Sequence, residues 1–468
     1  MIEYYLAIDI GASSGRHILG HLENGKVVME EIHRFPNGNH LVDGELIWDV
    51  DALFEEVLIG MKKCKEVGKI PVSVGIDTWA VDFVLLDANN RRIGNAVGYR
   101  DSGTTGMDQE VYKVILQDEL YGRTGIQKQI FNSIYQLMAW KERKPKLFAK
   151  AKTMLMIPDY LHFLLSGVKA TEYTNATTTQ LVSPKTKSWD FELIEKLGYP
   201  QGLFQKLVLP GTCLGGLKED IQDMVGFQCN VVLPATHDTA SAVLAVPVKK
   251  GQEEKDILYI SSGTWSLVGT ELETANCDME SALCNLTNEG GYDYRFRYLK
   301  NIMGLWMIQS IKKEIGRNYS YSEICNLATK DEIRSLVEAN DNRFLTPNSM
   351  TEEIKAACRE TGQQVPETLA EVASVVYRSL AQCYGKAITE IERLTGRKFD
   401  GIHIVGGGSN AEYLNELTAK TTGLPVYAGP TEATAIGNLS AQMIANGELK
   451  DLWDARNCIF DSFEIKVY

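Results

Sequence analysis

The sequence predicts an α/β protein with more than one domain, and three observations support this. A chain of 468 residues exceeds one ordinary domain and suggests two large domains or three. A pattern of apolar run, small polar turn and second apolar run occurs at residues 4–22 and again at residues 257–270. The last part of the chain alternates between strand-like and helix-like segments, which is typical of α/β folds.

The composition indicates which kinds of binding partner and which cellular location are expected. Hydrophobic residues make up 44% of the chain, enough for a sizeable core, and the net charge is −13. This charge argues against nucleic acid or an anionic membrane as a partner, because both call for a basic patch. We see no signal peptide and no apolar run of membrane-spanning length. Nine scattered cysteines and seven histidines show no metal-ligand spacing, so we expect a cytoplasmic protein with reduced thiols, as a monomer or homodimer.

The first predicted strand carries an unusual carboxylate. Residues 4–10 form an apolar run that is interrupted only by Asp9, and a buried aspartate is costly unless it is paired or binds a cation. The turn from Gly11 to Gly15 has no large side chain before Arg16, so its backbone N–H groups can approach an anion. One interpretation is a phosphate site with magnesium at Asp9. An ordinary hairpin whose Asp9 caps the turn is equally open, and the segment is not a Walker A loop.

The next segments predict a meander followed by alternating elements. Asn24-Gly25 is a hairpin signal, with a third strand at residues 27–35. An amphipathic helix at residues 51–67 precedes a strand that ends at a second inward carboxylate candidate, Asp77. Two further helices are expected at residues 133–144 and 158–166. The threonine-rich residues 172–179 are predicted to form a loop, which either is unremarkable in function or lines a substrate cleft.

A short strand near residue 232 ends in His237-Asp238-Thr239, and a helix of small residues begins there. Open α/β folds place their chemistry beyond the carboxyl ends of strands, so Asp238 is a candidate general base. The alternative is that Asp238 only caps the helix. The charged, turn-rich residues 248–255 predict a domain boundary, which gives domains at 1–247 and 248–468.

The second domain repeats the phosphate-turn pattern without the aspartate, at Ser262-Gly263-Thr264. A helix is expected to begin after a loop near residue 300, and a long amphipathic helix at residues 368–395 ends at Gly396. Three glycines, Gly406 to Gly408, separate a buried strand from a helix. They remove side chains where a flat ligand could lie against the backbone, and the helix N-terminus favours a phosphate.

Taken together, these segments resemble the FGGY carbohydrate kinases, which are part of the actin/hexokinase/Hsp70-like ATPase superfamily. The similarity runs along essentially the full chain, and its motifs are specific as an ordered set rather than singly. They are Asp9-Ile-Gly-Ala-Ser-Ser-Gly-Arg16, Gly75-Ile-Asp-Thr-Trp-Ala-Val-Asp-Phe-Val-Leu-Leu86, Glu172-Tyr-Thr-Asn-Ala-Thr-Thr-Thr-Gln180, His237-Asp-Thr-Ala-Ser241, Ser261-Ser-Gly-Thr-Trp-Ser266, Thr287-Asn-Glu-Gly-Gly291, Lys300-Asn-Ile-Met-Gly-Leu-Trp306 and Val405-Gly-Gly-Gly408.

The resemblance implies a fold and an activity. The fold would be two actin-like (ribonuclease H-like) domains around an interdomain cleft, with sugar and base on the N-terminal side and nucleotide on the C-terminal side. The activity would be ATP-dependent phosphorylation of L-rhamnulose at its 1-hydroxyl, in rhamnose catabolism. Asp238 would be the catalytic base, and Asp9 would hold Mg²⁺ directly or through water. The implied ATP contacts are Ala12, Ser13, Ser14, Gly15, Arg16, Thr264, Gln309 and Gly407. The implied sugar contacts are Ala80, His237, Asp238, Thr239 and Asn301.

Two departures from the family pattern bear on sugar choice. The family tends to have arginine where this chain has Gly103, and it often has glycine where this chain has Ala80. A kinase for another ketose, such as L-fuculose or xylulose, is the alternative within the family. An actin- or Hsp70-like ATPase acting on protein partners is the alternative outside it, but a general base aimed at a sugar, Asp238, has a role only in a kinase.

Overall fold

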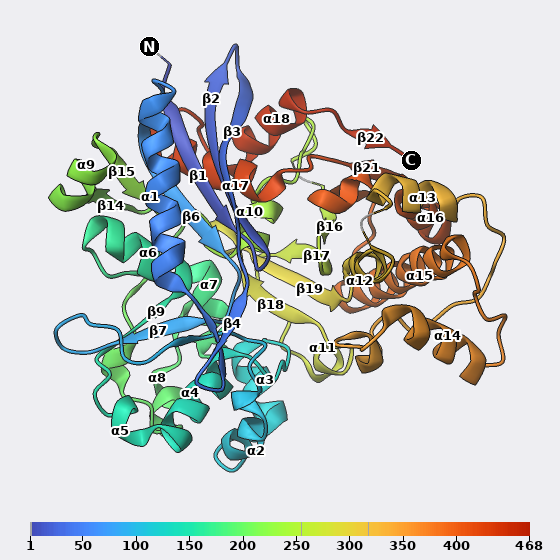
Figure 1. The fold of residues 1–468 in the computed structure, drawn as a ribbon, viewed down its shortest axis with the longest axis horizontal. Coiled ribbons are helices and arrows are strands. Elements are labelled where there is room, and N and C mark those ends of the chain that lie inside the picture. Colours follow the sequence, from blue (N-terminus) through green and yellow to red (C-terminus); the bar gives the residue numbers. More distant parts are fainter. Residues whose placement is uncertain (1, 254, 317) are drawn as a thin grey trace. The chain divides into compact units, whose positions relative to one another are not determined.

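The computed structural model describes residues 2–253, 255–316 and 318–468, which form two compact units (Figure 1). Unit 1 contains the described residues as far as Ala245, together with Leu272–Tyr298 and Thr434–Ser462. Unit 2 contains the described residues of Val246–Glu271, Leu299–Ala433 and Phe463–Tyr468. The chain therefore enters unit 1 again twice after residue 248, so the compact units do not correspond to one cut in the sequence.

Unit 1 holds most of the strands. They are β1 (Tyr4–Ile10), β2 (Ser14–Glu23), β3 (Lys26–Pro36), β4 (Asn39–Val42), β5 (Glu45–Trp48), β6 (Pro71–Thr78), β7 (Phe83–Leu86), β8 (Ala96–Val97), β9 (Thr153–Met156), β10 (Thr171–Glu172), β11 (Val182–Ser183), β12 (Ser188–Trp189), β13 (Leu207–Val208), β14 (Cys213–Gly216), β15 (Asn230–Val232) and β18 (Thr287–Gly290). Its helices are α1 (Val50–Glu66), η1 (Ser102–Thr104), α2 (Met107–Tyr112), α3 (Gln117–Thr124), α4 (Ser133–Arg143), α5 (Pro145–Phe148), α6 (Ile157–Ser166), α7 (Tyr173–Thr177), α8 (Phe191–Lys196), η2 (Gln201–Leu203), α9 (Glu219–Val225), α10 (Asp238–Leu244), α11 (Met279–Leu283), η3 (Tyr292–Tyr294), α17 (Ala433–Asn446, all but its first residue) and α18 (Leu452–Ser462).

The main sheet of unit 1 has the strand order β14-β15-β6-β1-β2-β3. Strand β1 is antiparallel to β2 and parallel to β6, and β6 is parallel to β15. The predicted hairpin is confirmed: Asn24 and Gly25 have φ of 52° and 76°, the left-handed pair that a two-residue turn between twisted strands requires. The predicted strands and helices of the first hundred residues are present, within a few residues of their expected ends.

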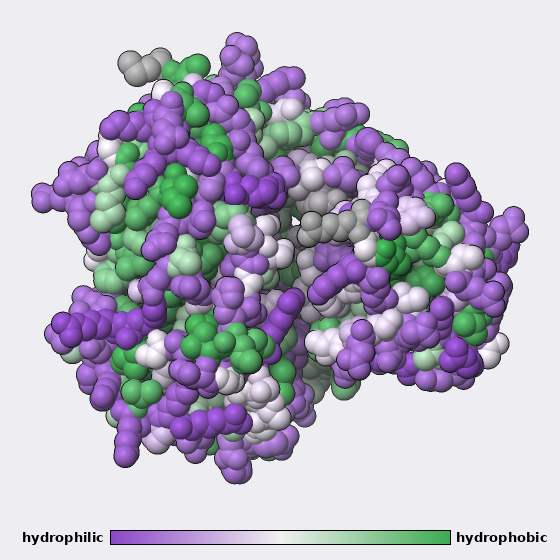
Figure 2. Space-filling model, viewed as in Figure 1, coloured by the Kyte–Doolittle hydropathy of each residue, from purple (hydrophilic) through white to green (hydrophobic). Residues whose placement is uncertain are grey.

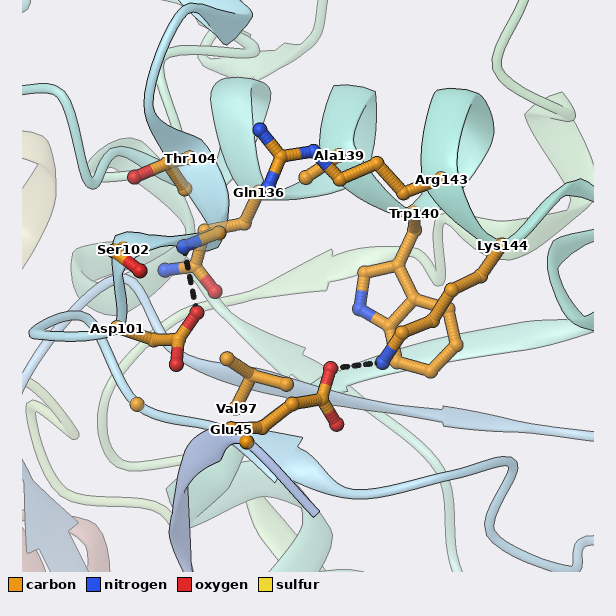
Figure 3. A pocket seen from close by; sticks show the side chains of 13 residues that line it. Glu45, Val97, Asp101, Ser102, Thr104, Gln136, Ala139, Trp140, Arg143 and Lys144 are labelled. Atoms are coloured by element: carbon orange, nitrogen blue, oxygen red, sulfur yellow. Dashed lines mark hydrogen bonds and ion pairs between the residues drawn. The ribbon is translucent and has the colours of Figure 1, made fainter. Parts of the chain in front are cut away.

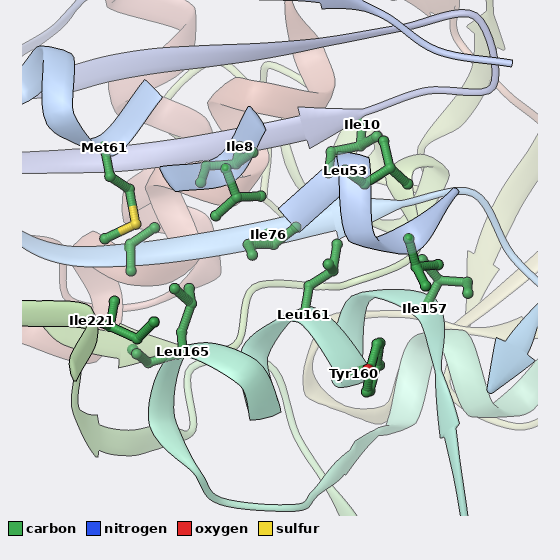
Figure 4. Packing of buried hydrophobic residues seen from close by; sticks show 14 of the residues in the cluster. Ile8, Ile10, Leu53, Met61, Ile76, Ile157, Tyr160, Leu161, Leu165 and Ile221 are labelled. Atoms are coloured by element: carbon green, nitrogen blue, oxygen red, sulfur yellow. The ribbon is translucent and has the colours of Figure 1, made fainter. Parts of the chain in front are cut away.

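The two faces of β1 pack against different helices. Leu6, Ile8 and Ile10 join a core with α1, α6 and α9, part of which Figure 4 shows around Ile76. Tyr5 and Ala7, on the opposite face, pack against α17 and α18. Because side chains alternate along a strand, Asp9 belongs to the face of Tyr5 and Ala7, the face that α17 covers.

A second core in unit 1 forms around α4 and the antiparallel pair β7 and β9. The threonine-rich segment contributes to it, and here the expectation of a loop is wrong. Tyr173–Thr177 forms α7, because the buried Glu172 side chain accepts hydrogen bonds from the backbone N–H groups of Thr174 and Asn175 and so caps the helix. Sequence pattern alone missed this, since a five-residue helix has no measurable periodicity.

Unit 2 has a sheet that includes the strand order β17-β16-β20-β21-β22, with β22 at one edge. Its strands are β16 (Leu258–Ser262), β17 (Ser266–Leu272), β19 (Phe296–Ile302), β20 (Ile402–Val405), β21 (Val426–Ala428) and β22 (Lys466–Val467), of which β17 and β19 contain residues of both units. Its helices are α12 (Trp306–Glu314), α13 (Tyr321–Ala328), η4 (Asn342–Phe344), α14 (Met350–Glu360), α15 (Leu369–Thr395), η5 (Gly407–Asn410) and α16 (Glu412–Thr422).

The long helix α15 matches its sequence signals at both ends. A capping box joins Thr368 and Glu371 at the start, and Gly396 ends the helix with φ of 69°. The expectation for residues 300–309 is partly wrong. Lys300 to Ile302 belong to strand β19, and the helix begins only at Trp306.

None of the helices in the described part of the chain combines the length and apolar character needed to cross a membrane. Hydrophilic residues cover most of the face seen in Figure 2, with smaller apolar groups between them.

Candidate active site

Three carboxylates of unit 1 lie at the carboxyl ends of neighbouring chain segments. Asp9 and Asp77 are register partners near the ends of the parallel strands β1 and β6. The end of β6 also meets the segment before α10, because the Thr78 N–H donates to the Thr236 carbonyl at 2.9 Å and Thr78 forms a β-bridge with His237. Asp238, the first residue of α10, follows directly. The site therefore forms at the sheet edge where open α/β folds place their chemistry.

These carboxylates influence one another. Burial, and then the negative charge of Asp9, raise the pKa of Asp77 well above its ordinary value. The same two causes raise the pKa of Asp238 to about 6. About a third of the Asp238 side chain remains accessible, so a substrate group can reach it, whereas Asp77 is fully buried. Of the pair, only Asp238 combines a raised pKa with access, as a general base requires.

Asp9 is paired rather than isolated. Its Oδ2 accepts hydrogen bonds from Nε and Nη2 of Arg16 at 3.0 and 2.8 Å. Both residues belong to the predicted phosphate turn, and their pairing offsets part of the desolvation cost that a lone buried aspartate would carry. The turn is closed by a hydrogen bond from the Gly11 N–H to the Ser14 carbonyl at 2.9 Å.

Gly15 is required for packing. A Cβ at this position would lie 2.1 Å from the buried ring of Phe35, so a side chain fits only if that ring moves. Packing against Phe35 is therefore a reason for a glycine at position 15 that is independent of its predicted nucleotide role. Ala12, Ser13 and Ser14 are more accessible than Gly15 in this turn.

The fit of a divalent cation can be judged from the donor atoms. In the residues that the structure describes, no three His, Cys, Asp or Glu side chains are grouped so as to hold a metal ion. Asp77 Oδ2 accepts a hydrogen bond from Asn438 at 2.5 Å, while its buried Oδ1 has no partner among the described residues. Mg²⁺ commonly uses only one or two carboxylates and completes its shell with water and phosphate oxygens. Asp9 and the unpaired oxygen of Asp77 suit such a site.

Asp238 is held by its neighbours. Its Oδ1 accepts hydrogen bonds from the Thr239 N–H at 2.5 Å and the Thr239 hydroxyl at 3.1 Å. Nε2 of His237 lies 3.4 Å from the same oxygen. Thr239, predicted to contact the sugar, thus orients the carboxylate through its hydroxyl. His237 is itself contacted by Arg297, whose Nη2 lies 2.9 Å from Nδ1.

From the sequence, Asp82 is expected either to be catalytic in place of Asp77 or only to tie the hairpin together; in the structure this buried carboxylate organises the loop after β6. Its Oδ2 accepts hydrogen bonds from the indoles of Trp48 and Trp79 at 2.6 and 3.0 Å and from the Tyr99 N–H at 3.0 Å. The two indole rings lie 3.9 Å apart. Ala80, a predicted sugar contact, is inside this loop, and its carbonyl accepts the Asp82 N–H at 2.9 Å. The loop is therefore rigidly framed.

Gly103, which stands where the family tends to have arginine, lines a pocket of about 200 Å³ (Figure 3). The side chains of Gln136, Trp140 and Arg143 point into it from α4, and Asp101 faces them. Asp101 Oδ1 accepts the Gly103 N–H at 2.6 Å, and a Cβ at position 103 would lie 2.6 Å from the same atom. The glycine therefore fits this turn and leaves the pocket open. The other lining residues are Gly44, Glu45, Val97, Gly98, Ser102, Thr104, Ala139 and Lys144.

In unit 2, two of the predicted nucleotide residues come together. The Thr264 hydroxyl lies 3.4 Å from Oε1 of Gln309, and the Thr264 carbonyl accepts the Trp306 N–H at 2.9 Å, which ties the turn to the start of α12. Gly304 makes this close approach possible, since a Cβ there would lie 2.6 Å from backbone atoms of the turn. Asn301, a predicted sugar contact, lies on β19 and is partly buried.

The three glycines after β20 have different roles. Gly406 has φ of 87°, and a Cβ on Gly408 would lie 1.9 Å from the Ser262 hydroxyl, so both are needed for packing against the turn after β16. Gly407 has open space around its Cβ position. Of the three glycines, Gly407 is therefore the one that has free space beside it, and its place in a nucleotide site stays a prediction.

Sequence reasoning missed Arg297 and Glu289, and gave no role to Asn438. These residues lie far along the chain from the carboxylates they accompany. A weak signal was present for Arg297, a charged residue inside the apolar strand sequence Phe-Arg-Tyr-Leu, where a buried cation needs a partner.

Comparison with known proteins identifies the family. Residues 4–245 match the N-terminal domain of the FGGY family of carbohydrate kinases, and residues 258–446 match its C-terminal domain. A curated rhamnulokinase of Halalkalibacterium halodurans is 51% identical over 467 residues, which covers 100% of this chain and 99% of that protein. The rhamnulokinase of Bacillus subtilis is 44% identical, with 99% of this chain and 95% of that protein covered.

Solved structures agree on the fold at much lower identity. Gluconate kinase from Lactobacillus acidophilus has a TM-score of 0.80 at 17% identity, covering 100% of this chain and 94% of that one. Xylulose kinase from the same organism has a TM-score of 0.79 at 16% identity, covering 100% and 93%. These neighbours support the two-domain, actin-like α/β fold, and the full-length family matches lead to one conclusion: the chain belongs to the FGGY family of carbohydrate kinases.

Proposed function

We propose that this carbohydrate kinase is a rhamnulokinase, which transfers the γ-phosphoryl group of ATP to the 1-hydroxyl of L-rhamnulose. The observation that carries the proposal is Asp238, a carboxylate with a pKa raised to about 6 and a third of its side chain accessible. The choice of sugar is supported by curated relatives named rhamnulokinase that are 40–51% identical over nearly the whole chain.

Asp238 would act as the general base. A sugar hydroxyl is a weak nucleophile, so its proton must pass to a positioned acceptor as the oxygen–phosphorus bond forms. Near neutral pH a carboxyl group of pKa about 6 is mostly ionised, yet it is more basic than an ordinary aspartate. Thr239 donates two hydrogen bonds to Oδ1 of Asp238, which leaves Oδ2 as the acceptor for the proton of the incoming hydroxyl.

ATP would contact Ala12, Ser13, Ser14, Gly15 and Arg16 of unit 1, and Thr264, Gln309 and Gly407 of unit 2. The open space at Gly407 and the Thr264–Gln309 contact support the assignments in unit 2. Magnesium, held by Asp9 and Asp77 with water, would neutralise charge on the phosphate oxygens. Arg16 would have to share or release Asp9 when the cation binds, since it donates twice to that carboxylate.

The sugar would be held by Ala80, His237, Thr239 and Asn301 beside Asp238. The rigid frame around Asp82 supports Ala80 as a shape-selecting contact. In terms of function, we retain residues 1–247 as the sugar and base domain and residues 248–468 as the nucleotide domain. No disulfide bond joins the cysteines of the described residues, in keeping with the cytoplasmic enzyme that we propose. We also propose that the protein is a monomer or homodimer.

Another ketose, such as L-fuculose or xylulose, is the second candidate. The pocket at Gly103 supports this second candidate, because its lining is connected to the loop of a predicted sugar contact. Gln136 lines the pocket and also donates to Asp82 Oδ1 at 2.8 Å. A change in the pocket can therefore be transmitted to the loop that carries Ala80.

The test is ADP release coupled to a detecting enzyme, with L-rhamnulose, L-fuculose and xylulose as separate substrates. We expect ADP release to require L-rhamnulose and to be at least about 10-fold more efficient than with the other ketoses. Phosphorus NMR of the product should identify a 1-phosphate. Preference for another ketose would overturn the sugar assignment, and ATP turnover that ignores every sugar would favour an actin- or Hsp70-like ATPase.

A further inference from the structure

A buried arginine in unit 1 lies behind the candidate base. Arg297, on β19, is fully buried. Its Nε donates to the Gly290 carbonyl at 2.9 Å, and its Nη2 lies 3.1 Å from Oε2 of Glu289. These two contacts, both to β18, fix the plane of the guanidinium group. Burying a charged group costs free energy, and hydrophobic residues of similar volume often stabilise a protein equally well. A buried arginine at this position therefore suggests a role other than stability.

The guanidinium determines which nitrogen of His237 carries the proton. Arg297 Nη2 lies 2.9 Å from His237 Nδ1. A guanidinium group can only donate, so Nδ1 must be the acceptor and therefore bears no proton. The imidazole must then be neutral, with its single proton on Nε2. Burial, and then the charge of Arg297, hold the pKa of His237 well below its ordinary value, which agrees with this assignment.

The remaining N–H group of His237 faces the base. Nε2 lies 3.4 Å from Asp238 Oδ1, slightly longer than an ordinary hydrogen bond. The N–H group therefore attracts the carboxylate only weakly, and the carboxylate can still accept a proton. A protonated imidazole at the same place would form an ion pair with Asp238 and weaken it as a base. A neutral imidazole with the opposite tautomer would turn an unprotonated nitrogen towards the carboxylate and repel it.

We propose that Arg297 is a positioning residue: it holds His237 as the neutral Nε2–H tautomer, and His237 in turn keeps Asp238 oriented and ionised. Glu289 supports this arrangement by balancing the buried charge, since its Oε2 lies 3.1 Å from Arg297 and 3.5 Å from His237 Nδ1. The charged groups around His237 are thus Arg297, Glu289 and Asp238. This inference rests on the proposed role of Asp238.

The first test is the pH profile of kcat/KM for Arg297→Gln. Removing the guanidinium charge removes an influence that lowers the pKa of both His237 and Asp238, so both should rise. The acid limb should therefore move to higher pH by about 1 unit, as expected for loss of a neighbouring opposite charge. With the apparent pKa moved from about 6 to about 7, the ionised fraction of Asp238, and with it kcat/KM, should fall by about threefold at pH 6.5 and hardly change at pH 8.5. Arg297→Lys, which keeps the charge, should recover part of the loss.

Arg456→Gln is the matched control. Arg456 is also fully buried in unit 1, but it donates to the carbonyls of Val243 and Leu244 at the other end of α10. Its loss should destabilise the same helix without moving the acid limb. A folded Arg297→Gln enzyme with the wild-type pH profile, or an equal shift in Arg456→Gln, would overturn the proposal.

The second test needs no activity and no variant at position 297. In wild-type enzyme labelled with ¹⁵N-histidine, the His237 signals, assigned by their absence in His237→Asn, should show a bare Nδ1 and a protonated Nε2 between pH 6 and 8. A protonated Nδ1 or an imidazolium would overturn the inference. Because this reading is independent of turnover, it distinguishes failure here from failure of the proposed reaction.

Discussion

The position of the candidate base depends on a glycine in the helix that packs behind it. Gly437 of α17 meets the backbone of α10, and a Cβ on this residue would lie 1.8 Å from the Ser241 carbonyl oxygen. Side-chain β-carbons do not approach other atoms closer than 3.0 Å, so Gly437→Ala must move the two helices apart by at least 1.2 Å. The obstacle is backbone, so no rotamer change can relieve it. Asp238 is three residues from Ser241 and must move too.

The expected cost follows from this displacement. A shift of about 1 Å in a catalytic group can cost about 10²-fold in rate, so kcat for the ketose should fall by about two orders of magnitude. Overpacking should also lower the free energy of unfolding by about 1–3 kcal/mol. The assay is steady-state ADP release at saturating ATP and sugar, at a temperature well below the melting point of the variant.

Two control variants separate displacement from instability. Gly122→Ala adds a Cβ to another helix of unit 1, α3, at a site with nothing within 4 Å, and should leave kcat unchanged. Leu439→Ala removes a buried side chain from α17 itself and should cost about 2–5 kcal/mol of stability while leaving the α10 contact intact. If Gly437→Ala retains wild-type kcat, or if Leu439→Ala loses as much activity, the reasoning about α10 is wrong.

Three further predictions concern the carboxylates. The kcat/KM of the wild-type enzyme should fall below about pH 6, because Asp238 must be ionised to accept a proton and its pKa is raised to about 6; a profile flat to pH 4.5 would contradict this. Asp82→Asn should lower the free energy of unfolding by about 1–3 kcal/mol and raise KM for the sugar, because an amide N–H group must face buried donors such as the Trp48 indole; chemical denaturation and kinetics measure both. Asp9→Ala should weaken the binding of Mg·ATP in calorimetry, and unchanged magnesium dependence would reduce Asp9 to a structural partner of Arg16.

Much of the fold was predictable because its signals are local. The apolar run of residues 4–10 correctly predicted the buried strand β1, whose alternation places Leu6 and Ile8 in one core and Ala7 in another. Asn24-Gly25 and the capping residues of α15 likewise encode their own geometry. Errors arose where tertiary contacts decide. Glu172 turns a threonine-rich segment into a helix, and strand β19 extends into residues that resemble a loop before a helix.

Only the residues expected to contact the ligands could be predicted from the sequence, and not the residues that hold them in place. Asp9 and Asp238 stand out because a carboxylate at the end of an apolar strand needs an explanation. Their supports come from distant segments: Asn438 reaches Asp77 from 361 positions along the chain, and Arg297 reaches His237 from 60. No local pattern encodes such pairs. The packing role of Gly15 was equally hidden, since the ring that excludes a side chain there belongs to Phe35 on the neighbouring strand.

The most direct test of the account is Asp238→Asn, measured in two ways on one preparation. The substitution keeps the shape of the side chain and removes its ability to accept a proton. ATP binding should stay within about threefold of wild type, but kcat for L-rhamnulose phosphorylation should be lower by at least about 10²-fold. A variant that binds ATP normally and phosphorylates the ketose at a near-normal rate would contradict the account.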